Sequence, residues 1–507
     1  FFFKQKTAYE ISTRDWSSDV CSSDLNPYRL VNEGGESRFV KFHWLPLAGT
    51  HSLVWDEAVK ISGADPDFHR RDLWEAIESG QYPQYELALQ VFTEEEAEAF
   101  SFDVLDPTKL VPEELVPLRV VGRMVLDRNP DNFFAETEQV AFCPAHVVPG
   151  IDFSNDPLLQ GRLFSYLDTQ LSRLGGPNFH EIPINASLAQ VHNNQRDGMH
   201  RQAVNRGRAA YEPNSLAGGC PHQAGARGFV SVPEPMEDTK GRIKPEKFAD
   251  HYSQAALFWR SQSAAEQLHI VAAYRFELSR VTVPAVRKRV VSQLVHVAPE
   301  LAEAVADGLG FELPEGQALA REPLAQSEVE QSPALSLRAR PGEAGAAGRR
   351  VALLAFDGAD GTALREVHHA LAAAMAMPRF VGARLGSVDV QGGDPIEAET
   401  TLTAMPSVLW DAVVLPAHEA VLASLGQLAV VEFVIDQYRH GKPLLVLGEQ
   451  GTALLTALGI SAQLPDGRND PGVLLAEQGS AEDWSDFIAA ISRHRHPERE
   501  LAARVPA

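Results

Sequence analysis

The chain has 507 residues, of which 44% are hydrophobic and 22% are charged. This composition is typical of globular proteins, and at roughly 100–200 residues per domain the length predicts two to four domains. The formal net charge of −23 excludes nucleic acids and anionic membranes as expected partners, because the acidic surface would repel both. A small or neutral substrate is expected instead.

Membrane insertion and a disulfide framework are also unexpected. No apolar run approaches the ~20 residues that a transmembrane helix needs, and the apolar segment 425–435 is short and carries Glu432. The cysteines, Cys21, Cys143 and Cys220, are too few for a disulfide scaffold and are consistent with a reducing compartment. We therefore expect a cytoplasmic protein.

Residues 1–25, FFFKQKTAYEISTRDWSSDVCSSDL, differ in character from the rest of the chain. They lack the basic region and following apolar core of a signal peptide. The string resembles translated sequencing-adapter read-through, so we interpret it as a non-native leader. On this interpretation the native sequence begins near Asn26 and is truncated at its N-terminal end.

Residues 26–139 alternate between strand-like and helical patterns. Strand-like segments occupy 37–44, 82–92 and 118–128, and the segment 67–80 has helical periodicity with Leu73, Trp74 and Ile77 as its apolar stripe. This pattern predicts an α+β domain with long antiparallel strands.

The next two regions have different compositions. Residues 140–250 are rich in Pro, Gly, Asn and His, are interrupted by one helix, and are too long for an ordinary loop. We expect an extended arm that packs on other parts of the molecule or on other subunits. Residues 251–311 return to helical periodicity and predict a small helical subdomain.

The C-terminal third begins after a linker at 312–348, which is poor in aromatic residues and dense in Pro, Gly, Ala and charge. In 349–507, apolar strand-like segments alternate with helical ones. Fully apolar strands are typical of buried parallel sheets, so we expect an open α/β domain of flavodoxin-like type.

The segment RLFSYLDTQ, 162–170, carries the main candidate site. Arg162 and Tyr166 are four residues apart in a predicted helix, so they share one face and the guanidinium can reach the phenol oxygen. A cation there favours the deprotonated phenol, whereas an ordinary tyrosine, with a pKa of about 10, stays protonated at neutral pH. The alternative interpretation is a core tyrosine paired with arginine for packing.

This segment also resembles a known family. Six positions match the proximal haem-ligand signature of monofunctional haem catalases: Arg162, Phe164, Tyr166, Asp168, Thr169 and Gln170. Further stretches resemble catalases in the same order along the chain: FHWLPLAG, DPDFHRRDLWEAIESG, DPTKLVPEELVP, LDRNPDNFFAETEQVAF, PGIDFSNDPLLQGR, FHEIPIN, QRDGMHR and YEPNS. With the predicted C-terminal α/β domain, the resemblance covers 26–507 and is to the large-subunit catalases of hydroperoxidase II type.

The resemblance implies a function, a cofactor and an assembly. It implies decomposition of hydrogen peroxide to water and oxygen, a homotetramer, and a haem that is either haem b or a modified haem d. The region 26–139 would be the rest of a catalase β-barrel domain, and 140–250 a wrapping arm with the proximal haem helix.

The resemblance also assigns roles to individual residues. Tyr166 would be the proximal iron ligand, and tyrosinate is a known ligand of haem iron. Arg162 would bond to the phenolate, Asp156 would support Arg162, and Phe142 and Pro144 would line the proximal haem face.

Cys143 has two open interpretations. It is either a small buried hydrophobe, as free cysteine often is, or the residue that some large-subunit catalases join covalently to the β-carbon of the ligand tyrosine.

Two departures from the family limit the expected activity. Nothing in 26–507 matches the distal histidine, asparagine and serine of catalases, and Asn26, Pro27 and Tyr28 stand where the family tends to read His-Thr-Phe. We therefore expect no catalytic acid or base in this chain, which is then inactive alone. The alternatives are an inactive haem-binding or assembly fragment and a chaperone-like use of the C-terminal domain.

The C-terminal domain resembles class I glutamine amidotransferases, in which a cysteine nucleophile follows a central strand. Here the corresponding turn reads Gly448, Glu449, Gln450, Gly451, and no cysteine follows Cys220. Covalent catalysis by cysteine is therefore excluded, and a structural or assembly role is expected.

Overall fold

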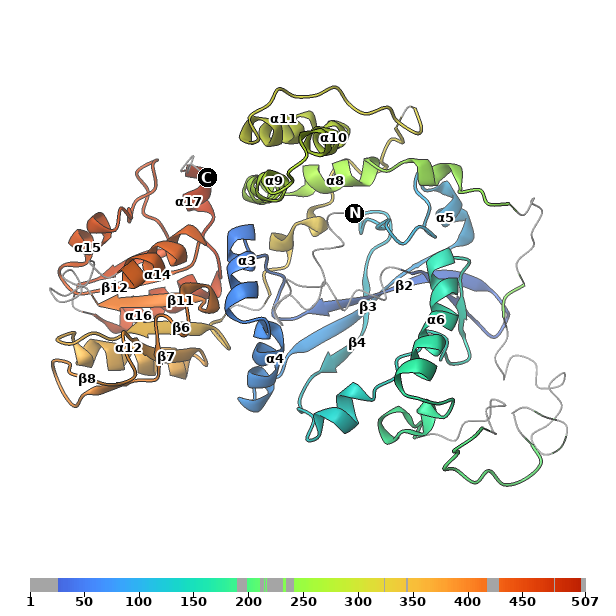
Figure 1. Ribbon diagram of the computed structural model, residues 1–507, viewed down its shortest axis with the longest axis horizontal. Coiled ribbons are helices and arrows are strands. Elements are labelled where there is room, and N and C mark those ends of the chain that lie inside the picture. The colour runs from blue at the N-terminus through green and yellow to red at the C-terminus, as the bar shows by residue number, and fades with distance from the viewer. Residues whose placement is uncertain are drawn as a thin grey trace.

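A computed structural model describes residues 26–188, 198–209, 214, 216, 231–233, 241–322, 324–342, 345–416, 428–477 and 479–502 (Figure 1). The fold is mixed α/β. An antiparallel sheet and a group of helices form the first part of the chain, and a parallel sheet flanked by helices forms the C-terminal part. The predicted leader 1–25, Cys220 and much of the predicted arm lie outside the described residues.

The first sheet is antiparallel throughout, with strand order β4-β3-β2-β1-β5. Its strands are β1 (Tyr28–Val31), β2 (Ser37–Pro46), β3 (Gln84–Phe92), β4 (Arg119–Val125) and β5 (Ile151–Phe153). The expected strand segments thus form β2, β3 and β4. The short strand β5 lies within the range 140–250 that we expected to form the arm, where it pairs with β1 in the register Tyr28 to Phe153.

Helices α3 (Trp55–Ala64) and α4 (Phe68–Glu78) lie between this sheet and the C-terminal domain (Figure 1). The stripe predicted for α4 is only partly correct. Ile77 is buried, but the Trp74 side chain is 44% exposed. Tryptophan is large and is seldom fully buried, so an apolar pattern alone did not settle its position.

Helix α6 (Pro157–Arg173) carries Tyr166 and lies across the first sheet from α3 and α4 (Figure 1). Its start follows from sequence: Asp156 accepts hydrogen bonds from the backbone N–H groups of Leu158 and Leu159, and Pro157 occupies the first turn. An aspartate cap and an early proline both favour a helix start, because they suit backbone N–H groups that have no partner within the helix.

Four helices follow the arm: α8 (Ser253–Ser261), α9 (Ala264–Ser279), α10 (Pro284–Leu294) and α11 (Pro299–Gly308). They share a core in which Val291, Ala302 and Val305 are fully buried. Helix α9 starts with a capping box, since Ser263 and Glu266 each bond to the other's backbone N–H.

The C-terminal sheet is parallel, with strand order β10-β7-β6-β11-β12-β13. Its strands are β6 (Arg350–Leu354), β7 (Met377–Gly382), β10 (Thr400–Thr401), β11 (Ala412–Pro416), β12 (Leu444–Leu447) and β13 (Val473–Ala476). The accompanying helices are α12 (Gly361–Ala373), α14 (Leu428–Arg439), α15 (Gly451–Ala457), α16 (Ala481–Ser492) and α17 (Glu498–Ala502). A short hairpin, β8 (Gly386–Val388) and β9 (Ile396–Ala398), lies beside β7.

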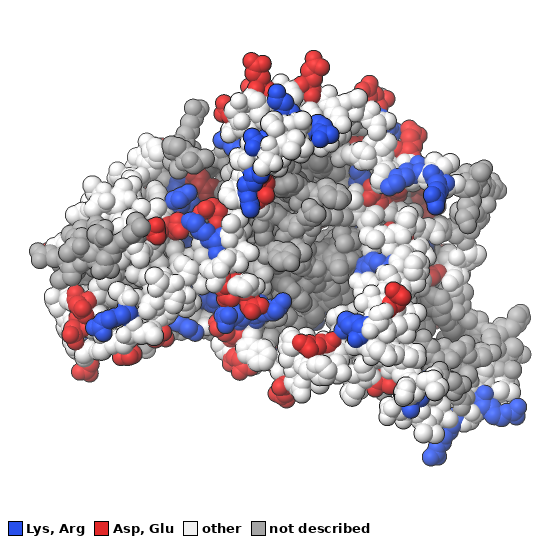
Figure 2. Space-filling model, in the orientation of Figure 1, with Lys and Arg blue, Asp and Glu red and all other residues white. Residues whose placement is uncertain are grey.

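Two hydrophobic clusters cover the two faces of this parallel sheet, as its fully apolar strands require. The central strands β6, β11 and β12 are buried along their whole length. Among the described residues on the face shown in Figure 2, basic and acidic side chains are interspersed. No helix of the described residues is both long and apolar enough to cross a membrane.

Candidate functional site

Tyr166 and Arg162 are in contact on one face of α6. The Arg162 Nη2 group donates a hydrogen bond of 3.1 Å to the Tyr166 phenol oxygen, and the guanidinium carbon lies 5.2 Å from the centre of the Tyr166 ring. Both side chains are half-buried. The structure therefore has the contact that the four-residue spacing predicts.

A second contact fixes the guanidinium from the opposite side. Arg162 Nη1 donates to Asn26 Oδ1 at 2.7 Å, and Asn26 Nδ2 donates to Asp156 Oδ2 at 2.5 Å. Asn26 and Asp156 are both fully buried. The support that we expected Asp156 to give Arg162 thus passes through Asn26.

Asp156 has a second structural role. Its other carboxylate oxygen, Oδ1, accepts hydrogen bonds from the backbone N–H groups of Leu158 at 2.7 Å and Leu159 at 3.2 Å. One buried carboxylate therefore caps the first turn of α6 and holds Asn26. Asp156 thus holds the start of the helix that carries Tyr166 and, through Asn26, also holds the Arg162 guanidinium.

Tyr28 lies at the edge of the same group. Its ring is 6.0 Å from Phe42 and 6.2 Å from Phe153, between centroids. Burial raises the pKa of Tyr28 above its ordinary value, and Arg162 opposes this effect. Tyr166, Asp156 and Cys143 each raise the pKa of Tyr28 further.

The segment that contains Phe142, Cys143 and Pro144 runs along the same helix. Gln170, four residues after Tyr166, donates from Nε2 to the Phe142 carbonyl at 3.2 Å. The segment just before it is held by Asn185, whose Oδ1 accepts from Ala141 N at 2.7 Å and whose Nδ2 donates to Gln139 O at 2.8 Å. Phe142 keeps 76% of its surface exposed, Cys143 is a free thiol of intermediate burial, and Pro144 is also partly buried.

The structure brings together most of the predicted residues. Tyr166, Arg162 and Asp156 belong to one hydrogen-bonded group, and Phe142 is attached to the same helix through Gln170. Sequence reasoning missed Asn26 as part of this group. The only signal in the sequence is that Asn26 stands where the resembled family tends to read histidine, which indicates a departure from the family and not a functional position.

Comparisons with known proteins agree on the family. The model of the family described as catalase matches residues 15–218, that of the catalase-related immune-responsive domain matches 245–309, and that of the C-terminal domain found in long catalases matches 347–500.

Similar proteins cover nearly the whole chain. "Catalase HPII" of Pseudomonas putida is 47% identical over 490 residues, which are 95% of this chain and 67% of that protein. "Catalase HPII" of Pseudomonas aeruginosa is 49% identical over 491 residues, with the same shares. "Catalase-2" of Bacillus subtilis is 45% identical over 481 residues, or 94% of this chain and 68% of that protein. The chain belongs to the catalase family, in its large-subunit branch.

The haem that this family implies fits the group around Tyr166. The phenol supplies an oxygen ligand of the kind that ferric iron accepts, and the adjacent guanidinium carries the matching positive charge. The exposed Phe142 ring, held along the helix of Tyr166, offers an apolar surface that a flat apolar group would cover. Phe164, on the same helix, is also 68% exposed.

Asn26 provides a test of the geometry that needs no cofactor. Replacing it by the similarly sized leucine, Asn26→Leu, deprives the buried Asp156 Oδ2 of its donor, which we expect to lower the free energy of unfolding by about 1–3 kcal/mol. Urea unfolding of the whole chain measures this. The control is Asn32→Leu, since Asn32 is exposed. Equal effects of the two changes would contradict the role assigned to Asn26.

Proposed function

We propose that this chain carries the proximal half of the haem site of a catalase that converts two hydrogen peroxide molecules to two water molecules and one oxygen molecule. The observation that carries the proposal is the Arg162–Tyr166 hydrogen bond, together with membership of the catalase family. Bound haem would supply the redox chemistry of this reaction.

In this proposal Tyr166 would hold the haem iron through its phenol oxygen, and Arg162 would be the hydrogen-bond partner of that oxygen. The guanidinium would donate its hydrogen bond to the oxygen that binds iron and would place a positive charge beside it. Asn26 donates to Asp156 and accepts from Arg162, so it fixes which guanidinium nitrogen faces the phenol. Phe142 and Pro144 would cover one face of the haem.

The distal acid–base chemistry is not assigned to any residue of 26–507. We retain the alternative that the chain as given is a haem-binding or assembly fragment without turnover. Haem loading and oxygen evolution separate the active catalase from the haem-binding fragment. Both proteins would need Tyr166 to hold the haem, but only the active catalase would cleave peroxide and evolve oxygen.

We also propose the location, the assembly and the haem type from membership of the family. We expect a cytoplasmic homotetramer with haem b or a modified haem d. For the C-terminal part, the parallel strand order favours a flavodoxin-like domain with a structural or assembly role. A cavity of about 430 Å³ lies at the carboxyl edge of its sheet, and the residues of the turn 448–450 line it without a cysteine.

Substitution at Tyr166 tests the ligand directly. Tyr166→Phe removes the phenol oxygen, so we expect the haem-reconstituted protein to lose its phenolate-to-iron absorption band and to release haem on gel filtration. Arg162→Leu should weaken haem affinity by roughly 10–100-fold, as loss of a ligand's hydrogen-bond partner typically does. Tyr82→Phe, at a 45% exposed position, is the matched control. An unchanged haem spectrum in Tyr166→Phe would remove the proposed ligand.

The same preparation measures turnover. Without a distal general acid and base, we expect the chain as given to evolve oxygen roughly 10²–10⁴-fold more slowly than a large-subunit catalase that has them. Vigorous oxygen evolution would show that those groups are present among residues that we did not recognise. Stable haem binding without turnover would favour the fragment function.

Cys143 leads to a chemical proposal of its own. We propose that its sulfur forms a bond to the β-carbon of Tyr166 during turnover, with loss of the thiol hydrogen and one β-hydrogen. Hydrogen peroxide is the oxidant and is reduced to two water molecules. The support is that Cys143 is a free thiol next to Phe142, whose carbonyl is bonded to the helix of Tyr166. The bond would protect the thiol from further oxidation.

Digestion and mass spectrometry of peroxide-treated haem protein measure this bond. We expect a cross-linked peptide pair with a mass two hydrogens below the sum of the separate peptides. The pair should be missing from Cys143→Ser, while haem binding is retained. Separate, unmodified peptides with a freely alkylatable thiol would leave Cys143 as an ordinary half-buried residue.

A further inference from the structure

The C-terminal domain is joined to the first part of the chain by a buried interface on α3. Ile61 of α3 is 6% exposed and belongs to the hydrophobic core of the C-terminal domain, together with Val408 and Leu409. Leu53 and Phe68, at either end of this region, pack on the same core. Helix α3 is thus shared between the two parts (Figure 1).

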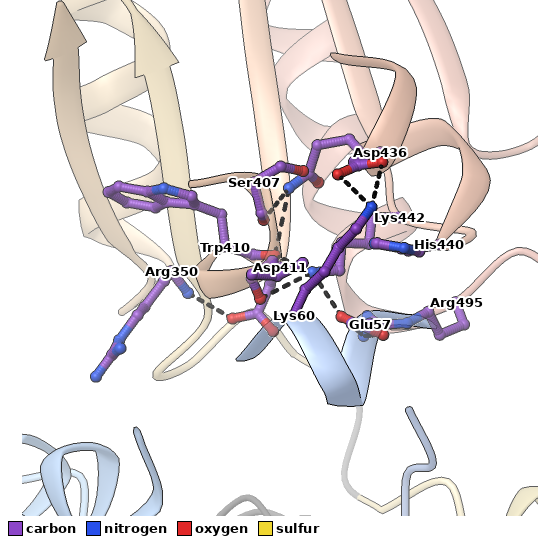
Figure 3. Close-up of polar contacts among 12 residues, drawn as sticks. Glu57, Lys60, Arg350, Ser407, Trp410, Asp411, Asp436, His440, Lys442 and Arg495 are labelled. Carbon is purple, nitrogen blue, oxygen red and sulfur yellow. Dashed lines mark hydrogen bonds and ion pairs between the residues drawn. The ribbon is translucent and has the colours of Figure 1, made fainter. Parts of the chain in front are cut away.

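A buried carboxylate lies at the centre of this interface. Glu57 of α3 is 1% exposed and lies 2.7 Å from Lys442 Nζ and 2.9 Å from Arg495 Nη2, both of the C-terminal domain (Figure 3). Lys442, also 1% exposed, donates in addition to the carbonyl oxygens of Trp410 at 2.7 Å and Val408 at 3.2 Å. Burial opposes ionisation of Glu57, but Arg495, Lys442 and His440 hold its pKa below the ordinary value.

A second ion group is built on Asp56, the residue that precedes Glu57 in α3. His440 Nε2 lies 2.9 Å from Asp56 Oδ2, and Lys60 Nζ lies 3.1 Å from the same carboxylate oxygen. Lys60 Nζ also lies 2.9 Å from Asp436 Oδ2 (Figure 3). The ligand atoms of Asp56, Asp436 and His440 are close enough to one another to hold a metal ion. The Lys60 ammonium already lies against both carboxylates, so this group is an ion-pair contact between α3 and α14.

His494 closes the interface on its other side. It is 7% exposed, and its ring centre lies 4.3 Å from that of His51, which precedes α3. The charged groups facing His494 are Asp411, Arg495 and Arg349, with Asp411 Oδ1 at 3.5 Å from Nε2. Burial, followed by Arg495 and Arg349, holds the pKa of His494 well below its usual range.

His440 is neutral for a similar reason. It is 2% exposed, and burial lowers its pKa. Of the groups that face it, Glu57, Asp56 and Asp436 favour the charged form and Lys442 opposes it. The net direction is downward. Two histidines from the C-terminal domain are thus neutral while they are buried against α3 and the segment before it.

We propose that this interface, defined by Glu57, Asp56, His440 and His494, is an acid-sensitive latch that holds the C-terminal domain on α3 at neutral pH and releases it as the pH falls below about 6.5. Release would expose both histidines and the Glu57 carboxylate to water. The fold of each part would persist, and the change would be in docking.

The direction of the pH effect follows from proton binding. A histidine exposed to water has an ordinary pKa of about 6.5, so the released state binds more protons below that pH than the docked state does. Docking is therefore strongest above about pH 6.5 and weakens as the pH falls. For a histidine that stays neutral when docked, the weakening at pH 5.5 is about tenfold. The lowered pKa values of Glu57 and Asp56 act in the same direction at still lower pH.

Hydrogen–deuterium exchange of the whole chain, corrected for the intrinsic pH dependence of exchange, measures docking. Between pH 7.5 and 5.5 we expect protection in α3 and in residues 440–442 and 493–496 to fall by up to about tenfold per titrating histidine. Protection in β2 and β3 should stay constant. Unchanged protection of α3 over this range would overturn the proposal.

Two variants separate the latch from general acid sensitivity. In His440→Gln the amide can still donate to Asp56, and in His494→Asn the new residue tolerates the left-handed backbone at this position, where φ is 63°. The double variant should lose the pH dependence and keep protection at pH 7.5, whereas His251→Asn, at an exposed site, should behave as the parent does. An equal loss of protection in the double variant and the parent at pH 5.5 would show that these histidines do not operate the latch.

Glu57→Gln tests the latch at its centre. This change leaves Lys442 and Arg495 without their carboxylate partner, so the 55–64 peptide should exchange faster already at pH 7.5. Glu98→Gln, at an exposed site in helix α5 (Glu94–Ala99), is the control. Full protection in Glu57→Gln would mean that the apolar contacts of Ile61 alone hold the domain.

Discussion

The hydrogen bond between Arg162 and Tyr166 organises the candidate site, because the other polar contacts there serve to hold its two partners. Asp156 caps the helix that carries both residues and also holds Asn26, which in turn binds the guanidinium. A buried carboxylate and a buried amide are costly unless their hydrogen bonds are made. Their burial therefore fixes the arginine in one orientation, with one nitrogen facing the phenol.

Spacing along one helix was the part of the site that the sequence could predict. Arg162, Tyr166 and Gln170 recur at intervals of four, and in the structure they line one side of α6. Asn26 could not be found in this way, since it is 130 residues from Asp156 in sequence and reaches it only because β1 pairs with β5. Contacts made by sheet pairing between distant segments leave no periodic signal in the chain.

In the fold, too, local sequence patterns predict some elements and leave others open. The apolar strands β6, β11 and β12 were evident from composition, because both faces of a parallel sheet are covered. The strand β13 gives a weaker signal, because it has only four residues, and Leu475 in it is 39% exposed. Trp74 fits the apolar stripe of the sequence pattern, yet 44% of its surface is exposed.

The C-terminal domain contacts α3 through buried charges that no pattern in the sequence singles out. Glu57 and Lys442 are both 1% exposed, and removal of one member of such a pair typically costs about 3–5 kcal/mol, because the other charge stays buried alone. A buried ion pair adds little net stability compared with apolar packing. The Glu57–Lys442 pair instead favours one orientation of the C-terminal domain on α3, next to the apolar contact of Ile61.

The central claim is that the Tyr166 oxygen binds iron as a phenolate. Resonance Raman spectroscopy of the haem-reconstituted chain measures whether a phenolate is bound to iron. The protein is produced once with ordinary tyrosine and once with ring-deuterated tyrosine. The chain has nine tyrosines. Excitation in the phenolate-to-iron band would enhance the ring vibrations only of a tyrosine that is bound to iron. If Tyr166 binds iron, we expect phenolate ring vibrations that shift on deuteration. A spectrum of bound haem with no band that shifts on deuteration would contradict it.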